Sequence, residues 1–366
     1  MAFRIVNFVI GTQNGQRAST ARCSASGLCA LTLSLACGSS VVDAGALPEG
    51  TDGNGISESP DAGSNITPGT PDEADPTGLG CTIADLGRYR LVFDSDSGRL
   101  ERRIYSMRAD GTELEALTPI GELAREPALS PDGSQLAYVT PEGIRLLTLA
   151  TGESELLMPG GDQPSWSADG LRLFHRVCSS SYGCGINAIA LADRSIEYFA
   201  GDQVASSPEV SPDGSTLVYA FNARPDYAGI EVVAGVQAVN TDLSLGIVWR
   251  PVESSPLHVS HPTISPDNIW LGAAIQCQNE PSPSLWVSPL AVPTPPCEGH
   301  RVTPAGAASV SNPKWGPGAL IAYERGTPPR DLTIVAADTG EECIIPRAGD
   351  DRNPSWAAPA DFQPPQ

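Results

Sequence analysis

The chain carries very little positive charge. Of its 366 residues, 22 are Lys or Arg and 43 are Asp or Glu, which gives a formal net charge of -21, and Lys314 is the only lysine. A chain this acidic repels phosphate backbones and anionic headgroups, so we expect no nucleic-acid binding and no membrane binding through a basic face. No apolar run reaches 18 residues, and no transmembrane helix is predicted.

The common motifs of catalysis are also missing. The chain has no Gly-x-x-x-x-Gly-Lys loop, no Gly-x-Gly-x-x-Gly fingerprint, no His-Glu-x-x-His pair and no Gly-x-Ser-x-Gly elbow. Its four histidines do not stand at metal-ligand spacing with a cysteine pair. We therefore predict a protein without catalytic residues, cofactor or metal.

The amino terminus has the pattern of an export signal. Three arginines and no acid precede an apolar block at 27–36, which ends at Cys37. A basic region followed by a short apolar core and small residues is typical of a secretory signal, which we predict over 1–36. Leu33-Ser-Leu-Ala-Cys37-Gly38 resembles a bacterial lipobox, although Ser34 stands where Leu is usual. The resemblance implies that Cys37 is acylated and becomes the first mature residue.

A polar segment follows. From Gly38 to Gly80 the chain holds eight acids and neither a basic nor an aromatic residue. Such a segment cannot bury enough apolar surface to offset its ordering entropy, so a disordered tether is predicted over 37–80. Gly38 is not the Asp that retains many lipoproteins at the inner membrane, so the lipobox resemblance implies an outer-membrane lipoprotein. A soluble periplasmic or secreted protein is the alternative.

One pattern recurs six times and decides the predicted fold. Aligned on one proline, its copies begin at Pro127, Pro164, Pro208, Pro262, Pro313 and Pro354. The fullest copy reads Pro-Ala-Leu-Ser-Pro-Asp-Gly over 127–133, and the spacings of 37, 44, 54, 51 and 41 residues match a four-stranded propeller blade. Asp-Gly permits a tight turn with positive φ, and β-branched and aromatic residues around it suit strands. The pattern predicts a hairpin between the innermost and second strands of each blade.

The two ends of the repeat region complete one another. Residues 89–118 hold the second, third and fourth strands of a blade without an innermost strand, whereas Pro354-Ser-Trp356 supplies an innermost strand with no blade after it. We therefore predict an all-β, six-bladed propeller of four-stranded blades over 81–358, closed by strands from both chain ends. A short tail follows at 359–366.

These repeats resemble those of the TolB-like six-bladed propellers, also described as PD40 or WD40-like repeats, which read Pro-x-Trp-Ser-Pro-Asp-Gly followed by an apolar strand. The resemblance covers about 88–357 and implies the fold. It implies little about function, because related repeats occur both in periplasmic scaffold proteins and beside peptidase domains.

Six cysteines remain after export, an even number that predicts three disulfides. Cys178 and Cys184 fall in a predicted loop and are expected to pair locally. Cys81 precedes the second strand of the composite blade and Cys343 begins the fourth strand of the blade before it, so we expect these two to pair at one end of neighbouring blades.

Cys277 and Cys297 then pair by elimination. The predicted turns place them at opposite ends of one blade, so the Pro-rich segment 293–296 has to fold back for this disulfide to form.

Other residues that could carry chemistry are predicted to be structural. Asp94-Ser-Asp-Ser-Gly98 resembles part of a calcium loop but lacks the later carboxylates, so a hairpin turn is favoured. His175 falls in a strand as an ordinary sheet residue. The three tryptophans two residues after an anchor proline are expected to pack between blades: Trp166, Trp315 and Trp356. The repeated turn acids are expected to hold turns: Asp132, Asp169 and Asp213.

One set of positions carries a functional hint. The residues just before the anchor prolines are all polar: Glu126, Gln163, Ser207, His261, Asn312 and Asn353. Equivalent positions in six blades encircle the axis near one mouth of the channel. Solvation alone accounts for such polarity; the alternative is a site for a peptide end or a small polar ligand.

We therefore predict an exported, lipid-anchored and monomeric propeller that serves as a non-catalytic binding or scaffold module. Its partner is an envelope protein or peptide that the sequence does not identify. Two alternatives remain: an enzyme that uses the channel, such as a lyase or hydrolase acting on a carbohydrate or peptide, and a purely structural surface protein.

Overall fold

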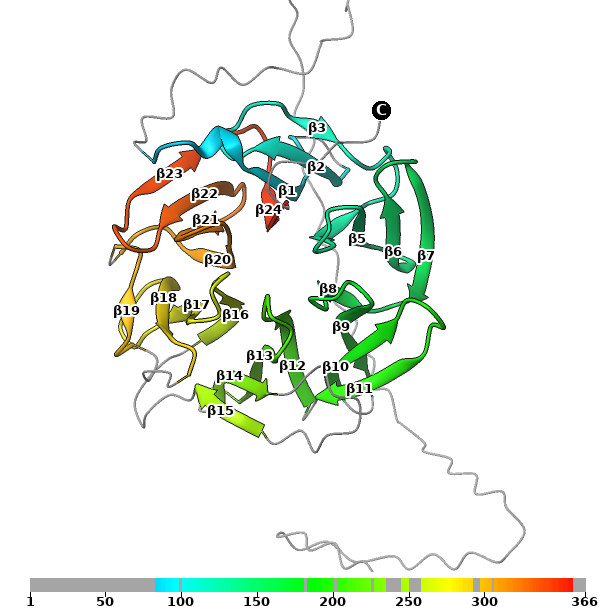
Figure 1. Cartoon of the computed structure of the whole chain (residues 1–366). Coiled ribbons are helices and arrows are strands. Elements are labelled where there is room, and N and C mark those ends of the chain that lie inside the picture. Colours follow the sequence, from blue (N-terminus) through cyan, green and yellow to red (C-terminus); the bar gives the residue numbers. More distant parts are fainter. Residues whose placement is uncertain are drawn as a thin grey trace, which may run out of the picture. The chain divides into compact units, whose positions relative to one another are not determined.

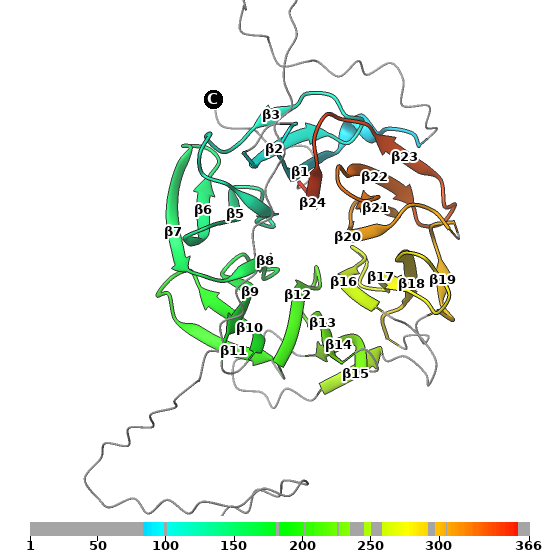
Figure 2. The same cartoon turned by 180° about the vertical axis from the view of Figure 1, so that it is seen from behind.

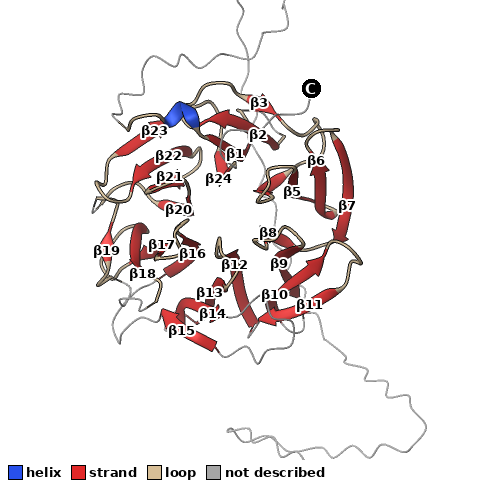
Figure 3. Ribbon diagram, in the orientation of Figure 1, coloured by secondary structure: helices blue, strands red, loops and turns tan. Residues whose placement is uncertain are grey.

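The structure is a computed structural model, which describes residues 83–357 except for 99–100, 181–182, 201–202, 225–226, 235–244, 250–257, 292–296 and 305. The predicted export signal with Cys37, the tether, Cys81 and the tail lie outside the described residues. All described residues belong to one compact unit. Their only helical element is a short 3-10 turn, η2 (Leu86–Arg88), and the rest is strands and turns (Figure 3). No helix of the described part is long and apolar enough to span a membrane.

The strands form successive antiparallel groups of four around a common axis (Figure 1). The group at the seam consists, from the axis outward, of β24 (Asp351–Trp356), β1 (Arg90–Ser95), β2 (Arg103–Arg108) and β3 (Glu115–Ala116). The next two are β4 (Arg125–Leu129), β5 (Gln135–Thr140), β6 (Gly143–Thr148) and β7 (Glu153–Pro159), then β8 (Asp162–Trp166), β9 (Arg172–Ser179), β10 (Gly183–Ala190) and β11 (Ile196–Ala200).

The other half of the ring has the same organisation. It consists of β12 (Gln203–Val210), β13 (Thr216–Arg224), β14 (Tyr227–Ala234) and β15 (Leu245–Trp249), then β16 (His258–Ile264), β17 (Trp270–Gln276), β18 (Ser284–Pro289) and β19 (His300–Arg301), and finally β20 (Val310–Trp315), β21 (Leu320–Arg325), β22 (Asp331–Ala336) and β23 (Glu342–Ile345). The view from behind shows the same ring (Figure 2).

Hydrogen bonding joins these groups into five sheets. Four sheets have four strands each, and the fifth has eight, because β10 pairs in parallel with β12 and so joins β8–β11 to β12–β15. The predicted all-β propeller of four-stranded blades is confirmed. The count of six blades stays a prediction.

The innermost strands form a closed ring. In order they are β24, β4, β8, β12, β16 and β20, each of which contacts the next, and β20 contacts β24. At the seam β24 pairs antiparallel with β1, so that Leu91 lies opposite Trp356 and Ser95 opposite Asp351. The predicted closure by strands from both ends of the propeller is confirmed.

The core lies between neighbouring groups. Val92 and Ile104 of the seam group, for example, pack with Leu136 and Tyr138 of the next group, and all four are fully buried. Because the second strands are covered on both faces, they read as continuous apolar runs such as 136–139 rather than as alternating patterns. Removing this apolar surface from water is the main stabilising contribution to the fold.

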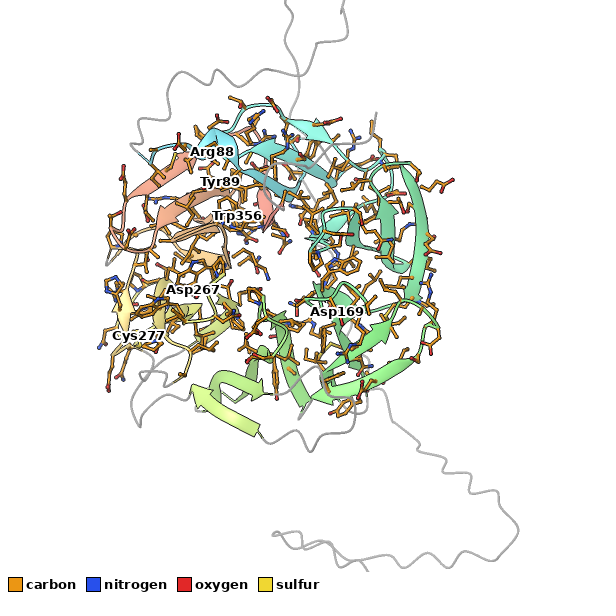
Figure 4. The ribbon with its side chains drawn as sticks, viewed as in Figure 1. Arg88, Tyr89, Asp169, Asp267, Cys277 and Trp356 are labelled. Atoms are coloured by element: carbon orange, nitrogen blue, oxygen red, sulfur yellow. A yellow bond between two sulfur atoms is a disulfide. The ribbon has the colours of Figure 1, made fainter. Side chains whose placement is uncertain are left out.

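The repeat tryptophans pack between neighbouring groups as predicted, and two of the three also join the groups by a hydrogen bond. Trp166 donates its Nε1–H to the carbonyl of Ala128 at 2.9 Å, and Trp356 donates to that of Lys314 at 2.9 Å. The Trp356 ring lies directly on Gly316, where a Cβ atom would approach it to 2.2 Å. It also packs edge-on against Tyr89, with 6.3 Å between ring centroids (Figure 4).

Trp315 also packs between groups as predicted, because its ring lies against Gly272 of β17 and on the apolar core that the two groups share, but its hydrogen bond differs. Its Nε1–H donates to the carbonyl of Gly318 at 3.2 Å, within its own hairpin, instead of bonding to the preceding innermost strand. The equivalent place on that strand belongs to Thr263, whose hydroxyl accepts the backbone N–H of Trp315 at 2.8 Å and donates to Glu209 at 2.8 Å. The indole therefore lies at the edge between the two groups.

The Ser-x-Asp-Gly segments make the predicted hairpin turns through side-chain hydrogen bonds. Ser130 Oγ donates to Asp132 Oδ1 at 2.6 Å, the same oxygen accepts the N–H of Ser134 at 3.0 Å, and Gly133 has a φ of 72°. Hydrogen bonds from serine hydroxyls and backbone N–H groups hold the pKa of each turn acid below its ordinary value. Equivalent bonds recur at Asp169, Asp213 and Asp267 (Figure 4).

The structure contains both disulfides predicted within its described residues. Cys178 and Cys184 lie directly opposite one another in β9 and β10, with Cα atoms 4.0 Å apart, so they belong to strand ends and not to the predicted loop. Cys277, just after β17, is bonded to Cys297, ahead of β19, with Cα atoms 5.9 Å apart. Cys343 in β23 is also disulfide-bonded, and the partner predicted for it lies outside the described residues.

Candidate functional site at the bulge ring

The six residues before the anchor prolines lie on the six innermost strands and share one backbone conformation. Their φ angles are all between 45° and 53°. L-residues adopt this left-handed conformation at a cost of about 1–2 kcal/mol, so its recurrence points to a structural demand common to all the repeats. We call these residues the bulge ring: Glu126, Gln163, Ser207, His261, Asn312 and Asn353.

The demand comes from the prolines. In β4, Glu126 and Pro127 together lie opposite the single residue Tyr138, between the pairs Arg125–Val139 and Ala128–Ala137. The same two-against-one bulge occurs at the other five positions. Proline has no N–H to donate to the sheet, and a bulge accommodates it while re-aiming the residue before it.

On one side of the ring, each re-aimed N–H bonds to a side chain of the preceding group. The N–H of Glu126 donates to Asp94 Oδ1 at 2.9 Å, that of Gln163 to Glu126 Oε2 at 2.7 Å, and that of Ser207 to Gln163 Oε1 at 2.7 Å. Adjacent groups are thus joined by a relay of hydrogen bonds from one group to the next. Asp94 is the first acceptor, and the ring side chains of Glu126 and Gln163 are the next two.

The relay continues through the seam. The N–H of Asn353 donates to Glu324 Oε1 at 2.8 Å, and its Nδ2 donates to Asp94 Oδ1 at 2.7 Å. Asn312 Nδ2 donates to Asn353 Oδ1 at 2.9 Å. The side chains of four ring residues are therefore engaged with neighbouring groups, and we call these four the closed arc: Asn312, Asn353, Glu126 and Gln163.

Two buried acids that the sequence analysis did not single out for the ring support the closed arc. Asp94 in β1 and Glu324 in β21 occupy equivalent places on second strands and are 0% and 2% exposed. Burial raises the pKa of Asp94 to about 6, an effect opposed by Arg102 at 2.6 Å and by the bonds from Asn353 and Glu126. The sequence signal that could have identified such an acid is its place as the single charged residue in an apolar strand, as in 91–94.

The predicted turn at 94–98 is present without Asp94. Ser97 and Gly98 have φ angles of 46° and 69°, and Asp96 Oδ1 accepts the N–H of Gly98 at 3.0 Å. Asp94 instead lies within β1, which ends at Ser95, so its assignment to the turn was wrong. Among the described residues, no group of three or more His, Cys, Asp or Glu side chains is arranged to hold a metal ion.

The remaining ring residues, Ser207 and His261, form the open arc. Within the described part of the chain, the hydroxyl of Ser207 has no hydrogen-bond partner and the shielded Nδ1 of His261 has none either. Nor does any described side chain accept the N–H of His261 or of Asn312. On the second strands of these two groups, the places equivalent to Asp94 and Glu324 hold alanines, Ala220 and Ala274.

Positive side chains flank the open arc. Burial lowers the pKa of His261 to about 3, and the positive charge of Lys314, together with His258 and Arg176, acts in the same direction. The imidazole is therefore neutral at pH 7 and has one donor and one acceptor nitrogen. Lys314 pairs with Glu209, and Arg176 pairs with Asp162 at 2.6 Å. The open arc thus offers a hydroxyl and a neutral imidazole for hydrogen bonding, beside two cations that are each paired with a carboxylate.

His175 is an ordinary sheet residue, as predicted, and lies opposite the bulge at Gln163 and Pro164. It is fully buried in β9, with Nδ1 3.4 Å from the carbonyl of Leu173, and burial lowers its pKa.

Comparison with known proteins addresses the fold. The chain matches no protein-family model and no curated protein sequence. Among solved structures, TolB from Acinetobacter baumannii superimposes with a TM-score of 0.62 at 18% identity, over 77% of this chain and 68% of that one. The fold is a TolB-like β-propeller.

Two further structures agree. A putative TolB from Agrobacterium tumefaciens gives a TM-score of 0.53 at 14% identity, over 73% of this chain and 92% of that one. A chain of a nidogen/laminin complex gives 0.56 at 13% identity, over 74% of this chain and 98% of that one. At these identities the TolB-like likeness concerns the fold alone.

Proposed function

We propose that this chain is an exported, non-catalytic propeller whose open arc receives the end of a peptide segment from an envelope protein. One observation carries the proposal: among the described residues the hydroxyl of Ser207 and Nδ1 of His261 have no hydrogen-bond partner, whereas the rest of the bulge ring binds neighbouring groups together. The polar residues of the closed arc are therefore explained by the hydrogen bonds that join neighbouring groups. Those of the open arc need a separate explanation, which a ligand would provide.

The chemistry of the open arc favours a ligand rich in acceptors. The hydroxyl of Ser207 can donate, two backbone N–H groups have no side-chain acceptor among the described residues, and Lys314 and Arg176 lie nearby in ion pairs with Glu209 and Asp162. A terminal carboxylate or an acidic side chain of a peptide meets these donors well. A propeller of the same fold occurs in a nidogen/laminin complex, a protein–protein assembly.

The same proposal includes six blades and export. Each half of the eight-stranded sheet begins with its own bulged innermost strand, β8 and β12, which supports counting it as two blades. The disulfides support an oxidising compartment. Lipidation at Cys37 and an outer-membrane location complete the proposal, with a soluble periplasmic or secreted protein as the alternative.

Site-specific photo-crosslinking tests the proposal. A photo-reactive residue replaces Ser207 at the open arc or, as a matched control, Ile196, which is 57% exposed on the outermost strand β11. We expect a discrete adduct from position 207 in intact cells and none from 196. Adducts of equal pattern from both positions, or none from 207, contradict the proposal.

A second arm measures affinity for the cross-linked partner's peptide. His261→Ala should weaken binding roughly 10-fold or more if this side chain is a central contact, whereas Ile196→Ala should leave it unchanged. Matching melting temperatures show that both variants are folded.

His261 also supports the alternative of a channel enzyme. Its neutral imidazole has an Nδ1 without a partner among the described residues, although the lowered pKa of about 3 makes it a weak general base. Turnover of a carbohydrate or peptide that is lost in His261→Gln, while peptide binding persists, would favour catalysis over binding.

A further inference from the structure

A cavity of about 420 Å³ lies between the groups β16–β19 and β20–β23, at the end of the innermost strands where the hairpin turns are. This is away from the bulge ring, which precedes those turns along the same strands. Residues from both groups line it, including Trp270 and His300 on one side and Trp315 on the other. Its volume suits a small organic molecule.

The cavity lies where the hydrogen bond of Trp315 differs from the repeat. In two other groups the equivalent indole bonds across to a carbonyl of the preceding innermost strand. Here the indole turns toward Gly318 in its own hairpin and becomes part of the cavity wall. Trp270, 39% exposed at the start of β17, contributes a second indole.

The polar groups in the lining are mainly acidic. Asp267 uses Oδ1 in its turn with Ser265 and Ile269, and within the described part of the chain its second oxygen has no hydrogen bond. Asp338 is an exposed carboxylate that follows β22. The lining that the structure describes contains neither Lys nor Arg.

Two indoles and two carboxylates in one lining form a favourable site for an organic cation. Cations bind over the face of tryptophan, most strongly when partly desolvated, and carboxylates add direct attraction. A ligand anion would meet the acids without a basic side chain to balance them. The chain's net charge of -21 also favours the approach of cations.

We propose that this cavity binds a small organic cation with an apolar body, of the quaternary or N-methylated ammonium class. The proposal is independent of the peptide site, because the cavity lies at the turn that follows β16 whereas His261 lies within β16, and the two sites share no residue.

Calorimetric titration of the disulfide-intact full chain with choline tests the proposal, with 3,3-dimethyl-1-butanol as its uncharged isostere. We expect saturable binding of choline with a Kd of about 1 mM or below, and roughly 2- to 30-fold weaker binding of the isostere. Equal affinity for both compounds, or no saturable binding of choline, overturns the proposal.

Variants locate the site. Trp270→Ala and Asp338→Asn should each weaken choline binding. Asp169→Asn should not, because Asp169 is the counterpart of Asp267 in another group and lies outside the cavity. Because Trp270 and Asp338 are partly or fully exposed, the variants should melt like the wild type. Unchanged binding in folded Trp270→Ala assigns choline to another place and overturns the proposal.

A last arm distinguishes two sources of the same ammonium chemistry. Co-sedimentation with phosphatidylcholine vesicles that free choline competes away assigns the cavity to a lipid headgroup. Choline binding without vesicle association assigns it to a free solute.

Discussion

The two arcs of the bulge ring occupy equivalent positions and do different work. On the closed arc, long or branched polar side chains reach the next group and bond to it. On the open arc, the hydroxyl of Ser207 is too short to continue the relay, and His261 stands beside small residues with its Nδ1 unpartnered. Equivalence in the repeat thus determines where a residue lies, while side-chain length and neighbours determine whether it stabilises the ring or stays available.

The largest effect is expected at the seam of the closed arc. Deleting 353–366 removes most of β24, its pairing with β1 and both seam bonds of Asn353. We expect an aggregated or much less stable chain, and Trp356→Ala alone should lower the free energy of unfolding by about 3–5 kcal/mol. Urea unfolding should be followed with disulfides intact and reduced, because Cys343 is disulfide-bonded near this seam. A deletion that unfolds like the full chain in both states contradicts this closure.

Removing the buried acid of the closed arc should have the next largest effect. Asp94→Ala leaves Arg102 without this ion-pair partner and the N–H of Glu126 without its acceptor. We expect a loss of about 3–5 kcal/mol, and a smaller loss for Asp94→Asn, which retains an acceptor. Denaturant titration measures both, with Asp193→Ala, at an exposed turn, as the control that should change little. Equal effects at positions 94 and 193 would show that the buried acid is dispensable.

A direct comparison of the arcs follows from single truncations. Glu126→Ala and Gln163→Ala each remove the acceptor of a neighbouring N–H, so each should cost about 1–3 kcal/mol. Ser207→Ala removes a hydroxyl with no partner among the described residues and should stay within about 0.5 kcal/mol. Chemical unfolding at pH 7 measures the three variants. Similar losses in all three would erase the distinction between the arcs.

The smallest effect is expected in the slope of stability with pH. The pKa of Asp94 is raised from 3.8 to about 6, so its contribution to stability is full below pH 3.8 and is lost as pH rises through 6. The pKa of His261 is lowered from 6.5 to about 3, so its contribution is full above pH 6.5 and is lost as pH falls toward 3. The two groups therefore act in opposite directions.

Unfolding free energies between pH 4 and 6 test these signs. Stability should rise more steeply with pH in Asp94→Asn than in the wild type, and less steeply in His261→Gln, by up to about 1.4 kcal/mol per pH unit in each case. A change of the same sign in both variants contradicts the assignment.

Much of this arrangement was predictable from the repeat. A proline followed by Ser-Pro-Asp-Gly identifies an innermost strand and its hairpin, because proline cannot donate to the sheet and Asp-Gly stabilises the turn. The same pattern placed six polar residues on one ring. It did not predict the bulge relay, which needs Asp94 and Glu324 from second strands whose sequences read as ordinary apolar runs.

Trp315 marks the limit of reasoning from a repeat. Its sequence position equals those of Trp166 and Trp356, and its ring packs between groups as predicted, but it does not bond across to the preceding innermost strand as the other two do. What differs is Thr263 on the neighbouring strand, whose hydroxyl accepts the backbone N–H of Trp315, while the indole bonds within its own hairpin. No pattern within one repeat contains that information.

The sequence by itself determined the strand type, the hairpin turns, the propeller and its closure at both ends, because these depend on backbone geometry and on apolar periodicity within each repeat. Only the tertiary structure decided which ring residues are engaged, which acids are buried and where a cavity opens. These outcomes depend on side chains from different groups that meet across the interface, where a difference of one methylene or one hydroxyl decides whether a hydrogen bond can form.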